Sequence, residues 1–420
     1  MSADTNKSMP EPIPVLSATT EQMAEQSSTP RLRLEFLDGL RGLAALYVTL
    51  HHACIMMTTQ TGYSLFWKYD DQAFPWALQQ FFHCFEMGRY SVILFIVLSG
   101  YCLMLPVVRS AGGTLKGGVQ GYFARRARRI LPPYYAALGL SLLLMALAYG
   151  VKYDAPPSMY SQLPAFTPGV IVSHLLLIHN LKVDWEFKIN GPLWSVATEW
   201  QIYFVFAFVL LPVWRRFGLV AAVAAGFVVG LLPHFVLHRL DMAAPWFIGL
   251  FALGMAGAVL TFSPDANYQR WRTRLPWGWM TLVGSGALFY GLLHPYGIGG
   301  REWQMDTLGG LISLCLILWL AQSALRPSVQ KPVGLRLLES RLPVTLGLFS
   351  YSLYLTHAPL EDVIRHILLP RLGLGVRADM AIMLLVAVPF CVVAAYLFHL
   401  AFERRFMSAP QRKSPQTKEA

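Results

Sequence analysis

The sequence contains few charged residues. Only 14% of its 420 residues are Asp, Glu, Lys or Arg, whereas 55% are hydrophobic. A soluble domain of this length would not bury so much apolar surface, so the composition indicates an integral membrane protein. The net charge of +11 does not indicate nucleic-acid binding. Most of the basic residues lie in short segments between apolar runs, where they set membrane topology.

Cysteine is also scarce. The five cysteines form no CxxC pair, and their spacing matches neither a disulfide framework nor a zinc site. Four of them lie in apolar runs, which is typical of small buried hydrophobic residues. No other metal-binding pattern is visible, so we expect no metal and no permanently bound cofactor.

The first residues of the sequence do not have the pattern expected of a cleavable leader. Residues 1–34 are polar, without the apolar core of a signal peptide, and we expect a disordered cytoplasmic segment there. Residues 406–420 are also polar and are expected to form a disordered cytoplasmic tail. The membrane domain is therefore predicted over residues 35–405, with no soluble domain attached at either end.

Long apolar runs are abundant, and ten of them are long enough to cross a bilayer. We therefore predict an all-α integral membrane protein with about ten transmembrane helices. An eleventh run, residues 170–181, is too short to span and is expected to be a re-entrant or interfacial helix, with His174 and His179 at the interface. The ten predicted spans lie near residues 37–58, 89–108, 133–151, 192–213, 217–236, 244–262, 277–293, 304–323, 343–361 and 379–402.

The distribution of basic residues predicts the orientation. With ten spans both termini lie on one face. Omitting Lys7, which is far from the membrane, the segments on that face hold 22 of the 34 Lys and Arg residues, against nine on the other. Short loops rich in Lys and Arg stay in the cytoplasm, so both termini are predicted to be cytoplasmic. The first and ninth spans then run outward, and the fourth runs inward.

Three titratable side chains fall at a similar depth in these spans. Helical rise places His52 of the first span, Glu199 of the fourth and His357 of the ninth in the outer half of the bilayer. Ionisable groups in the hydrocarbon region are costly unless they pair or face a polar cavity. We therefore predict that the three residues share one site, with a packing role as the alternative for His357.

Basic residues near the cytoplasmic face form a second candidate site. Arg41 lies eleven residues before His52, so both side chains project from one helix face, about 16 Å apart along its axis. Arg126 and Arg129 precede the third span on the same side of the membrane. Guanidinium groups bind phosphate in bidentate fashion, so the cluster indicates either a phosphate site or a topogenic anchor. The arginines immediately before these two, Arg125 and Arg128, are an alternative pair.

Four segments resemble the acyltransferase-3 family of membrane O-acyltransferases, which includes O-antigen and exopolysaccharide acetylases. They occur in the family's order, and the similarity covers roughly residues 35–405, without the fused hydrolase-like domain of some relatives. The segments are residues 37–52 with an Arg-x10-His pattern, 126–132 with Arg-x-x-Arg-Ile-x-Pro, 191–199 ending at Glu199, and 350–357 ending at His357.

The resemblance implies transfer of an acyl group, usually acetyl, from cytoplasmic acyl-coenzyme A (acyl-CoA) to a hydroxyl group. We predict that His52 is the general base, that Glu199 orients it, and that His357 or Tyr351 stabilises the oxyanion or positions the acceptor. A covalent acyl-histidine relay is the alternative mechanism. The predicted site residues are His52, Glu199 and His357 for catalysis, Arg41, Arg126 and Arg129 for acyl-CoA, and Tyr351 and Trp194 for the acceptor.

The acceptor is left open by the sequence. A glycan or lipid-linked saccharide outside a bacterial inner membrane fits the resemblance, which predicts polysaccharide O-acetylation, with membrane lipids as further partners and no nucleic acid. Trp185, Glu186 and Asn190 in an outer segment are weaker candidates for sugar contacts. A small hydroxylated metabolite is an alternative acceptor. A proton-coupled transporter is the alternative class of protein, although the two halves show no internal repeat.

Overall fold

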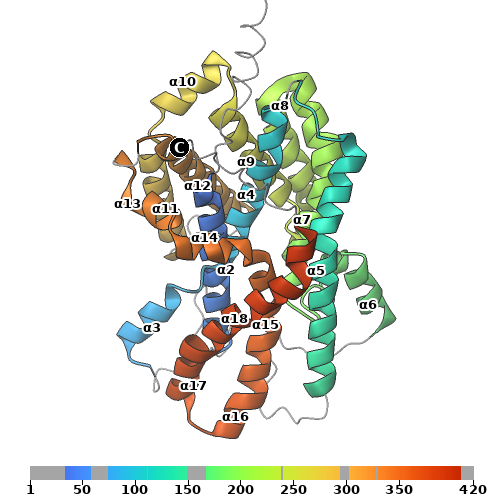
Figure 1. Cartoon of the computed structure of the whole chain (residues 1–420), viewed down its shortest axis with the longest axis vertical. Coiled ribbons are helices and arrows are strands. Elements are labelled where there is room, and N and C mark those ends of the chain that lie inside the picture. Colours follow the sequence, from blue (N-terminus) through green and yellow to red (C-terminus); the bar gives the residue numbers. More distant parts are fainter. Residues whose placement is uncertain are drawn as a thin grey trace, which may run out of the picture. The chain divides into compact units, whose positions relative to one another are not determined.

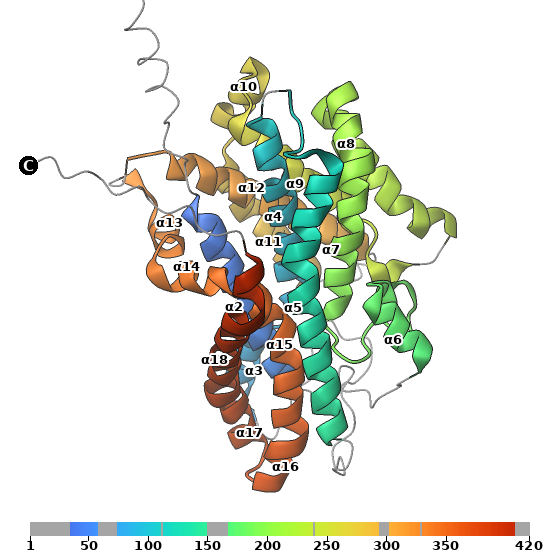
Figure 2. The same cartoon turned by 45° about the vertical axis from the view of Figure 1, so that its right-hand side comes forward.

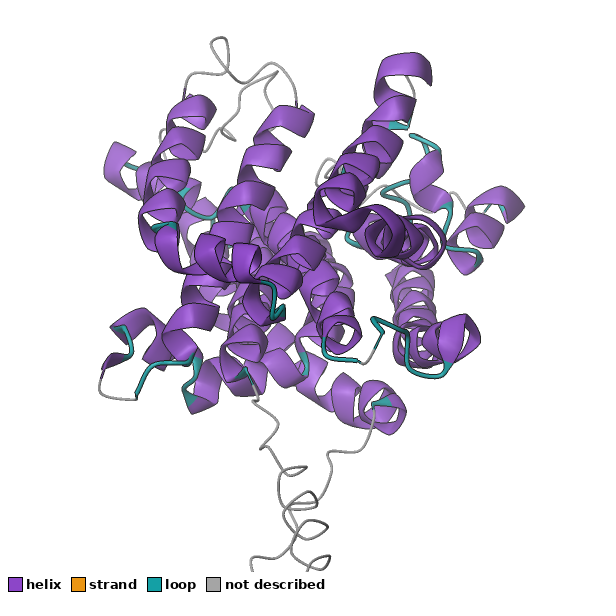
Figure 3. Ribbon diagram, turned by 90° about the horizontal axis from the view of Figure 1, so that it is seen from above, coloured by secondary structure: helices purple, strands orange, loops and turns teal. Residues whose placement is uncertain are grey.

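The computed structural model describes residues 34–57, 74–110, 112–148, 167–237, 240–293, 302–327 and 330–407. Within these ranges the chain forms helices and connecting turns, and no strand occurs (Figure 3). The predicted all-α class is therefore confirmed for this part of the chain. The terminal segments predicted to be disordered lie almost wholly outside the described residues.

Figure 1 shows the order of the helices along the chain. The first eight are α2 (Glu35–Ile55), α3 (Trp76–His83), α4 (Gly88–Val108), α5 (Gly118–Ala148), α6 (Pro168–Leu175), α7 (Leu193–Val205), α8 (Leu211–Leu232) and α9 (Phe247–Phe262). The others are α10 (Ala266–Arg274), α11 (Trp277–Leu293), α12 (Glu302–Ala324), α13 (Val333–Leu338), α14 (Arg341–Leu348), α15 (Ser350–Val363), α16 (Leu369–Leu372), α17 (Val376–Ile382) and α18 (Val388–Phe398). Short 3₁₀ or π-helical segments are η1 (His179–Leu181), η2 (Phe206–Leu210), η3 (Pro233–Leu237), η4 (Asp241–Ala243), η6 (Ile364–Leu368), η7 (Met383–Ala387), η8 (His399–Glu403) and η9 (Arg404–Phe406).

Six helical stretches of the described chain are long and apolar enough to cross a membrane. They are Trp76–Val108, Gly118–Leu147, Leu193–Val236, Asp241–Phe262, Glu302–Ala324 and Val376–Phe406. These stretches support an integral membrane protein, but the predicted number of about ten spans is not confirmed.

The difference in number has local causes. The predicted fourth and fifth spans form one stretch of 44 residues, which bends at Gly218, where φ is 85°. Helix α11 has only 17 residues, and the predicted ninth span is divided between α14 and α15 at the non-helical residue Phe349. Helix α2 has 21 residues but contains Asp38, Arg41 and two adjacent histidines, which lower its hydropathy.

Helix α2 packs against α4, α14, α15 and α18 (Figures 1 and 2). Its contact with α14 depends on glycine. A Cβ atom at Gly42 would clash with the carbonyl oxygen of Pro343, and one at Gly347 would clash with that of Asp38. Small residues on facing helices let their backbones approach closely. This packing fixes the position of α2, which contains both Arg41 and His52.

Helices α4 and α9 also meet through paired glycines. A Cβ atom at Gly100 of α4 would clash with the carbonyl oxygen of Phe251, and one at Gly254 of α9 would clash with that of Val97. The two helices are therefore in direct backbone contact over their middle turns. Since α4 is also packed against α2, this contact joins α9 and its neighbours to the helices that form the site.

A buried ion pair joins α4 to α12. The Nε and Nη2 atoms of Arg89 donate to Asp306, 2.8 and 2.6 Å from its two carboxylate oxygens. The indole Nε1 of Trp246 donates to the same carboxylate at 2.7 Å. Asp306 is 1% exposed, so three charge-assisted hydrogen bonds compensate for its burial.

Candidate active site

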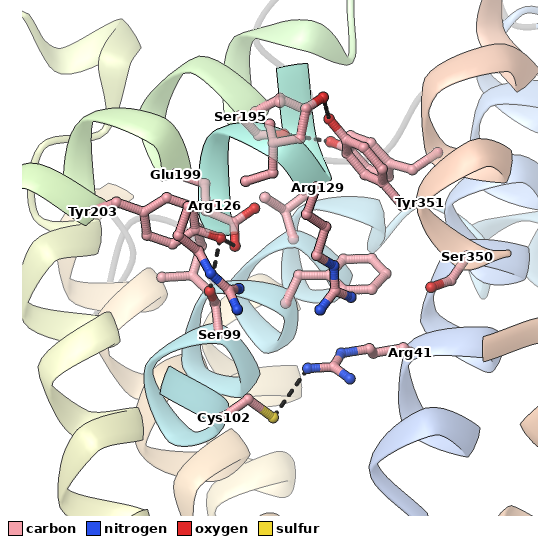
Figure 4. Close-up of a pocket in the computed structure, with 16 residues that line it drawn as sticks. Arg41, Ser99, Cys102, Arg126, Arg129, Ser195, Glu199, Tyr203, Ser350 and Tyr351 are labelled. Atoms are coloured by element: carbon pink, nitrogen blue, oxygen red, sulfur yellow. Dashed lines mark hydrogen bonds between the residues drawn. The ribbon is translucent and has the colours of Figure 1, made fainter. Parts of the chain in front are cut away.

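A cavity of about 250 Å³ lies among α2, α4, α5, α7 and α15 (Figure 4). One part of its wall is apolar, formed by Val92, Phe95, Ile96, Ile130 and Val196. The other part is charged or hydrogen-bonding. Its residues are Arg41, Ser99, Cys102, Arg126, Arg129, Ser195, Glu199, Tyr203, Ser350, Tyr351 and Tyr354. We call this cavity the arginine pocket.

Three guanidinium groups line the arginine pocket (Figure 4). Arg41 comes from α2, whereas Arg126 and Arg129 come from the first half of α5 and are one helical turn apart. The Nη2 atom of Arg41 lies 3.0 Å from the sulfur of Cys102, and its Nη1 lies 3.5 Å from an oxygen of Asp38. The three cations therefore converge although the chain between Arg41 and Arg126 includes all of α4.

The alternative pair of arginines lies elsewhere. Arg125 and Arg128 are exposed, and neither is among the described residues that line the arginine pocket. The Nη2 atom of Arg125 donates to the carbonyl oxygen of Lys116 at 2.6 Å. Successive helical residues point about 100° apart, so only one of the two pairs can face the pocket. The described structure places Arg126 and Arg129 there.

Glu199 contributes a carboxylate to the same wall. The hydroxyl group of Tyr203, one turn further along α7, donates to its Oε1 at 2.5 Å. Figure 4 shows Glu199, Tyr203 and Arg126 grouped on one side of the pocket. Glu199 thus balances part of the positive charge of the arginines. It is the single carboxylate among the described lining residues.

Hydroxyl groups line the part of the pocket next to α15. The Tyr351 hydroxyl donates to the carbonyl oxygen of Ile130 at 3.1 Å. The Ser195 hydroxyl lies 2.6 Å from the Tyr354 hydroxyl, which ties α7 to α15. These bonds hold α5, α7 and α15 around the cavity, and they leave hydroxyl oxygens on its surface.

His52 and His357 are in contact. The Nε2 atom of His357 lies 3.4 Å from Nδ1 of His52, and the ring centroids are 4.9 Å apart. Nδ1 of His52 is 2.9 Å from the carbonyl oxygen of Val48, and Nδ1 of His357 is 2.9 Å from that of Leu353. A carbonyl oxygen only accepts, so both Nδ1 atoms hold the proton of the neutral ring. The basic lone pair of each imidazole is therefore on Nε2.

The histidine pair lies just beyond the arginine pocket. Tyr354 lines the pocket, and its ring centroid is 5.9 Å from that of His357, which follows one turn later on α15. Arg41 and His52 are likewise at successive levels of α2. Neither histidine is among the described residues that line the pocket, but the pair lies one helical turn beyond Tyr354, whereas the three cations lie in the pocket itself.

Glu199 was predicted to share a site with the two histidines, but no contact among the described residues links it to either of them. The hydrogen bond of Glu199 is made with Tyr203, and its place is in the arginine pocket. Trp194 is also outside the described pocket lining. Its ring packs 6.0 Å from that of Phe247 on α9, which is a packing contact.

The histidines of the short segment, which the sequence predicted at the membrane interface, are buried among the helices of the protein. His174 and His179 are both 0% exposed, and their rings stack with centroids 3.9 Å apart. Burial and the neighbouring His174 lower the pKa of His179 to about 2, so the ring is neutral. The two rings are buried because α6 packs onto the other helices, with the Tyr134 hydroxyl of α5 donating to the carbonyl oxygen of His174.

Tyr203, Tyr354 and Cys102 are among the pocket residues that were not predicted from the sequence. Tyr203 is four residues after Glu199, a helical spacing that could have indicated the contact. Tyr354 is one turn from both Tyr351 and His357 and could have been found in the same way. Cys102 had no such signal, because its partner Arg41 is 61 residues away in the chain.

Comparison with known proteins identifies the family. The acyltransferase-3 family, described as an acyltransferase domain, matches residues 34–400. A proposed acetyltransferase of Acidianus two-tailed virus is 23% identical over 331 residues, covering 77% of this chain and 82% of that protein. A proposed peptidoglycan O-acetyltransferase of Bacillus subtilis is 25% identical over 183 residues, 42% of this chain and 23% of that protein. Protein 2 in the picA locus of Rhizobium radiobacter is 27% identical over 183 residues, 42% of this chain and 79% of that protein.

The chain belongs to the acyltransferase-3 family, because the family match covers most of its length. The predicted resemblance is thereby confirmed, as is the prediction of an enzyme that transfers acyl groups. No solved structure matches the chain.

Proposed function

We propose that this protein transfers an acetyl group from cytoplasmic acetyl-CoA to a hydroxyl group of a glycan or lipid-linked saccharide outside the membrane. The observation that most favours this function is the convergence of three arginines on one pocket, with the contacting pair of histidines one helical turn beyond Tyr354 of its lining. The proposed peptidoglycan O-acetylation of the Bacillus subtilis relative agrees with a glycan acceptor.

The arginine pocket has the chemistry of a donor site. Acyl-CoA presents several phosphate oxygens followed by a long, mostly apolar pantetheine arm that ends in the thioester. Arg41, Arg126 and Arg129 would bind phosphate oxygens, since guanidinium groups match them in charge and geometry. The apolar wall formed by Phe95 and its neighbours would contact the arm, which directs the thioester toward the histidines.

His52 would act as the general base through its Nε2 atom. It takes the proton of the acceptor hydroxyl while the hydroxyl oxygen attacks the thioester carbonyl carbon. The carbon–sulfur bond then breaks, and the leaving thiolate takes the proton back from the His52 imidazolium. The reaction yields an ester and free coenzyme A, with no net change in protons when the thiol is neutral.

His357 would position His52. Its Nε2 lone pair faces the Nδ1–H group of His52, and this contact strengthens when His52 becomes positively charged. The Nδ1–H group of His357 is directed at the Leu353 carbonyl oxygen, so the neutral ring has no N–H group left for an oxyanion. The geometry therefore favours positioning over oxyanion stabilisation. Glu199 would act in the donor pocket, beside the arginines.

Binding of acetyl-CoA to the purified protein in nanodiscs tests the donor site. We expect Arg41→Ala and Arg126→Ala each to weaken binding about 10- to 100-fold, the range for one hydrogen bond between charged groups. Arg125→Ala is the matched control, because its guanidinium binds the Lys116 carbonyl oxygen outside the pocket, and it should bind normally. Absence of saturable binding by folded wild-type protein would remove acetyl-CoA as the donor.

A further inference from the structure

A second cavity of about 30 Å³ lies beyond the histidine pair. On α15, Tyr354 lines the arginine pocket, whereas Ala358 and Asp362 line the second cavity, so His357 lies between the two cavities. Helix α2 shows the same order: Arg41 lines the first cavity, His52 follows, and Met56 just after the helix lines the second. Along both α2 and α15, the histidine of the pair therefore lies between a residue that lines the first cavity and a residue that lines the second.

Asn190 brings an unsatisfied hydrogen-bond acceptor to the second cavity. It is 2% exposed, and its Nδ2 atom donates to the Leu355 carbonyl oxygen at 2.9 Å and to the Ser141 hydroxyl at 3.1 Å. Because the carbonyl oxygen accepts only, these bonds settle the orientation of the amide. The Oδ1 atom is buried and has no hydrogen-bond partner among the described residues. A buried acceptor without a partner is rare and indicates an absent donor.

Asp362 supplies a second acceptor to the same cavity. Its Oδ1 atom is enclosed and makes no hydrogen bond with the described residues, although it lies 3.4 Å from Nε2 of His366. Two acceptor oxygens on one cavity wall favour a ligand that donates hydrogen bonds. The carboxyl group of Asp362 would repel a phosphate or carboxylate group. Asn190 Oδ1 is an acceptor, so it would offer such a group no hydrogen bond.

We propose that this cavity binds a hydroxyl group of the acyl acceptor, next to the hydroxyl that is acylated. This inference rests on the proposed function. A cavity of about 30 Å³ has room for a small polar group such as a hydroxyl. The ligand class is therefore a polyol or sugar, whose hydroxyl donates to Asn190 Oδ1 or Asp362 while a neighbouring hydroxyl faces His52. Charge and size together make this small cavity the part of the enzyme that selects the acceptor.

Acceptor kinetics of the full-length protein in nanodiscs test the assignment. The probes are methyl glucoside, N-acetylglucosamine and glycerol, with acetyl-CoA as donor, and the acetylated product is measured by mass spectrometry. We expect Asp362→Asn to raise the KM for the probe about 2- to 10-fold, because the amide keeps one acceptor oxygen but replaces the other with an N–H donor. Asn190→Ala should raise it about 2- to 10-fold, since a neutral acceptor is lost. Neither change should alter the KM for acetyl-CoA.

Glu361→Gln is the matched control. Glu361 is the adjacent carboxyl of α15, but it does not line the cavity, is 0% exposed and has no hydrogen-bond partner among the described residues. Its replacement should leave the KM for the probe unchanged. If Asn190→Ala fails to fold, as judged by acetyl-CoA binding, Asp362→Asn decides the matter.

The outcomes separate this assignment from the proposed function. An unchanged KM for the probe in Asp362→Asn, with normal acetyl-CoA binding, would mean that the cavity holds only water and would overturn the assignment. Wild-type protein that binds acetyl-CoA but acetylates none of the three probes would also overturn it. Wild-type protein that does not bind acetyl-CoA would instead overturn the proposed function, and with it the inference.

Discussion

Replacement of His52 should lower the rate of acetyl transfer much more than replacement of His357. His52→Gln removes the general base, and general-base catalysis typically contributes about 10²- to 10⁴-fold, so we expect a loss of that size in kcat. His357→Leu removes only the lone pair that faces Nδ1 of His52. That contact is 3.4 Å long, and the Val48 carbonyl oxygen at 2.9 Å continues to hold the Nδ1–H group.

The expected loss for His357→Leu follows from these contacts. One neutral hydrogen bond contributes about 0.5 to 1.5 kcal/mol, which corresponds to about 2- to 13-fold in rate. A bond of 3.4 Å belongs at the weak end of that range. The tautomer of His52 should be unchanged, because it is held by Val48. The two variants should therefore differ by at least about tenfold in kcat.

The assay is acetyl transfer at saturating acetyl-CoA, with acetyl-CoA binding as the check that each variant is folded. His51→Gln is the matched control, because Nδ1 of His51 bonds to the Phe85 carbonyl oxygen, outside the pair, and glutamine retains a donor. This variant should keep nearly full activity. A loss in His357→Leu as large as that in His52→Gln would refute the assigned roles and would indicate that His357 itself reacts. Full activity of His52→Gln would refute the general-base mechanism.

Two further predictions concern stability. Asp306→Leu should lower the free energy of unfolding by about 1 to 3 kcal/mol, because it leaves the Trp246 indole without its partner and the partly exposed Arg89 guanidinium with Glu302 alone, and thermal unfolding in detergent measures this. The double variant Asp306→Leu/Arg89→Met should recover part of the loss, and no recovery would mean that the unpaired charge is not its cause. Burial raises the pKa of Glu186 to about 8. The folded protein therefore keeps a proton that the unfolded chain loses above its ordinary pKa of 4.5, and stability should fall as the pH rises from about 4.5 to 8, by at most about 1.4 kcal/mol per pH unit. In Glu186→Gln the melting temperature should lose this part of its pH dependence, and identical profiles for the two proteins would contradict the assignment.

Local spacing in the sequence was sufficient to choose the arginines that line the pocket. Arg41 and His52 were predicted to share one helix face; in the structure Arg41 lines the arginine pocket and His52 contacts His357. The choice of Arg126 and Arg129 over Arg125 and Arg128 also agrees with the pocket lining. These relations lie within single helices, where a period of 3.6 residues determines which side chains point the same way.

Depth along a predicted span was a poorer guide. Glu199 was grouped with the histidines because three positions were measured from the expected membrane surface. In the structure α7 starts at Leu193, and its packing places Glu199 beside the arginines. Hydropathy locates a residue along one axis only, and the level at which a helix begins depends on its neighbours. The burial of His174 and His179 was missed for the same reason.

The sequence by itself determined the helical class, the membrane character, the family and the helix faces that contain the arginines and histidines, because composition and local periodicity are properties of the chain. Only the tertiary structure decided which of those faces meet. The contact of His52 with His357 joins residues 305 positions apart, and that of Arg89 with Asp306 joins residues 217 apart. Such pairs depend on the close packing of helices through glycines such as Gly42 and on the cost of leaving a buried polar group without a partner, and neither is a local property of the sequence.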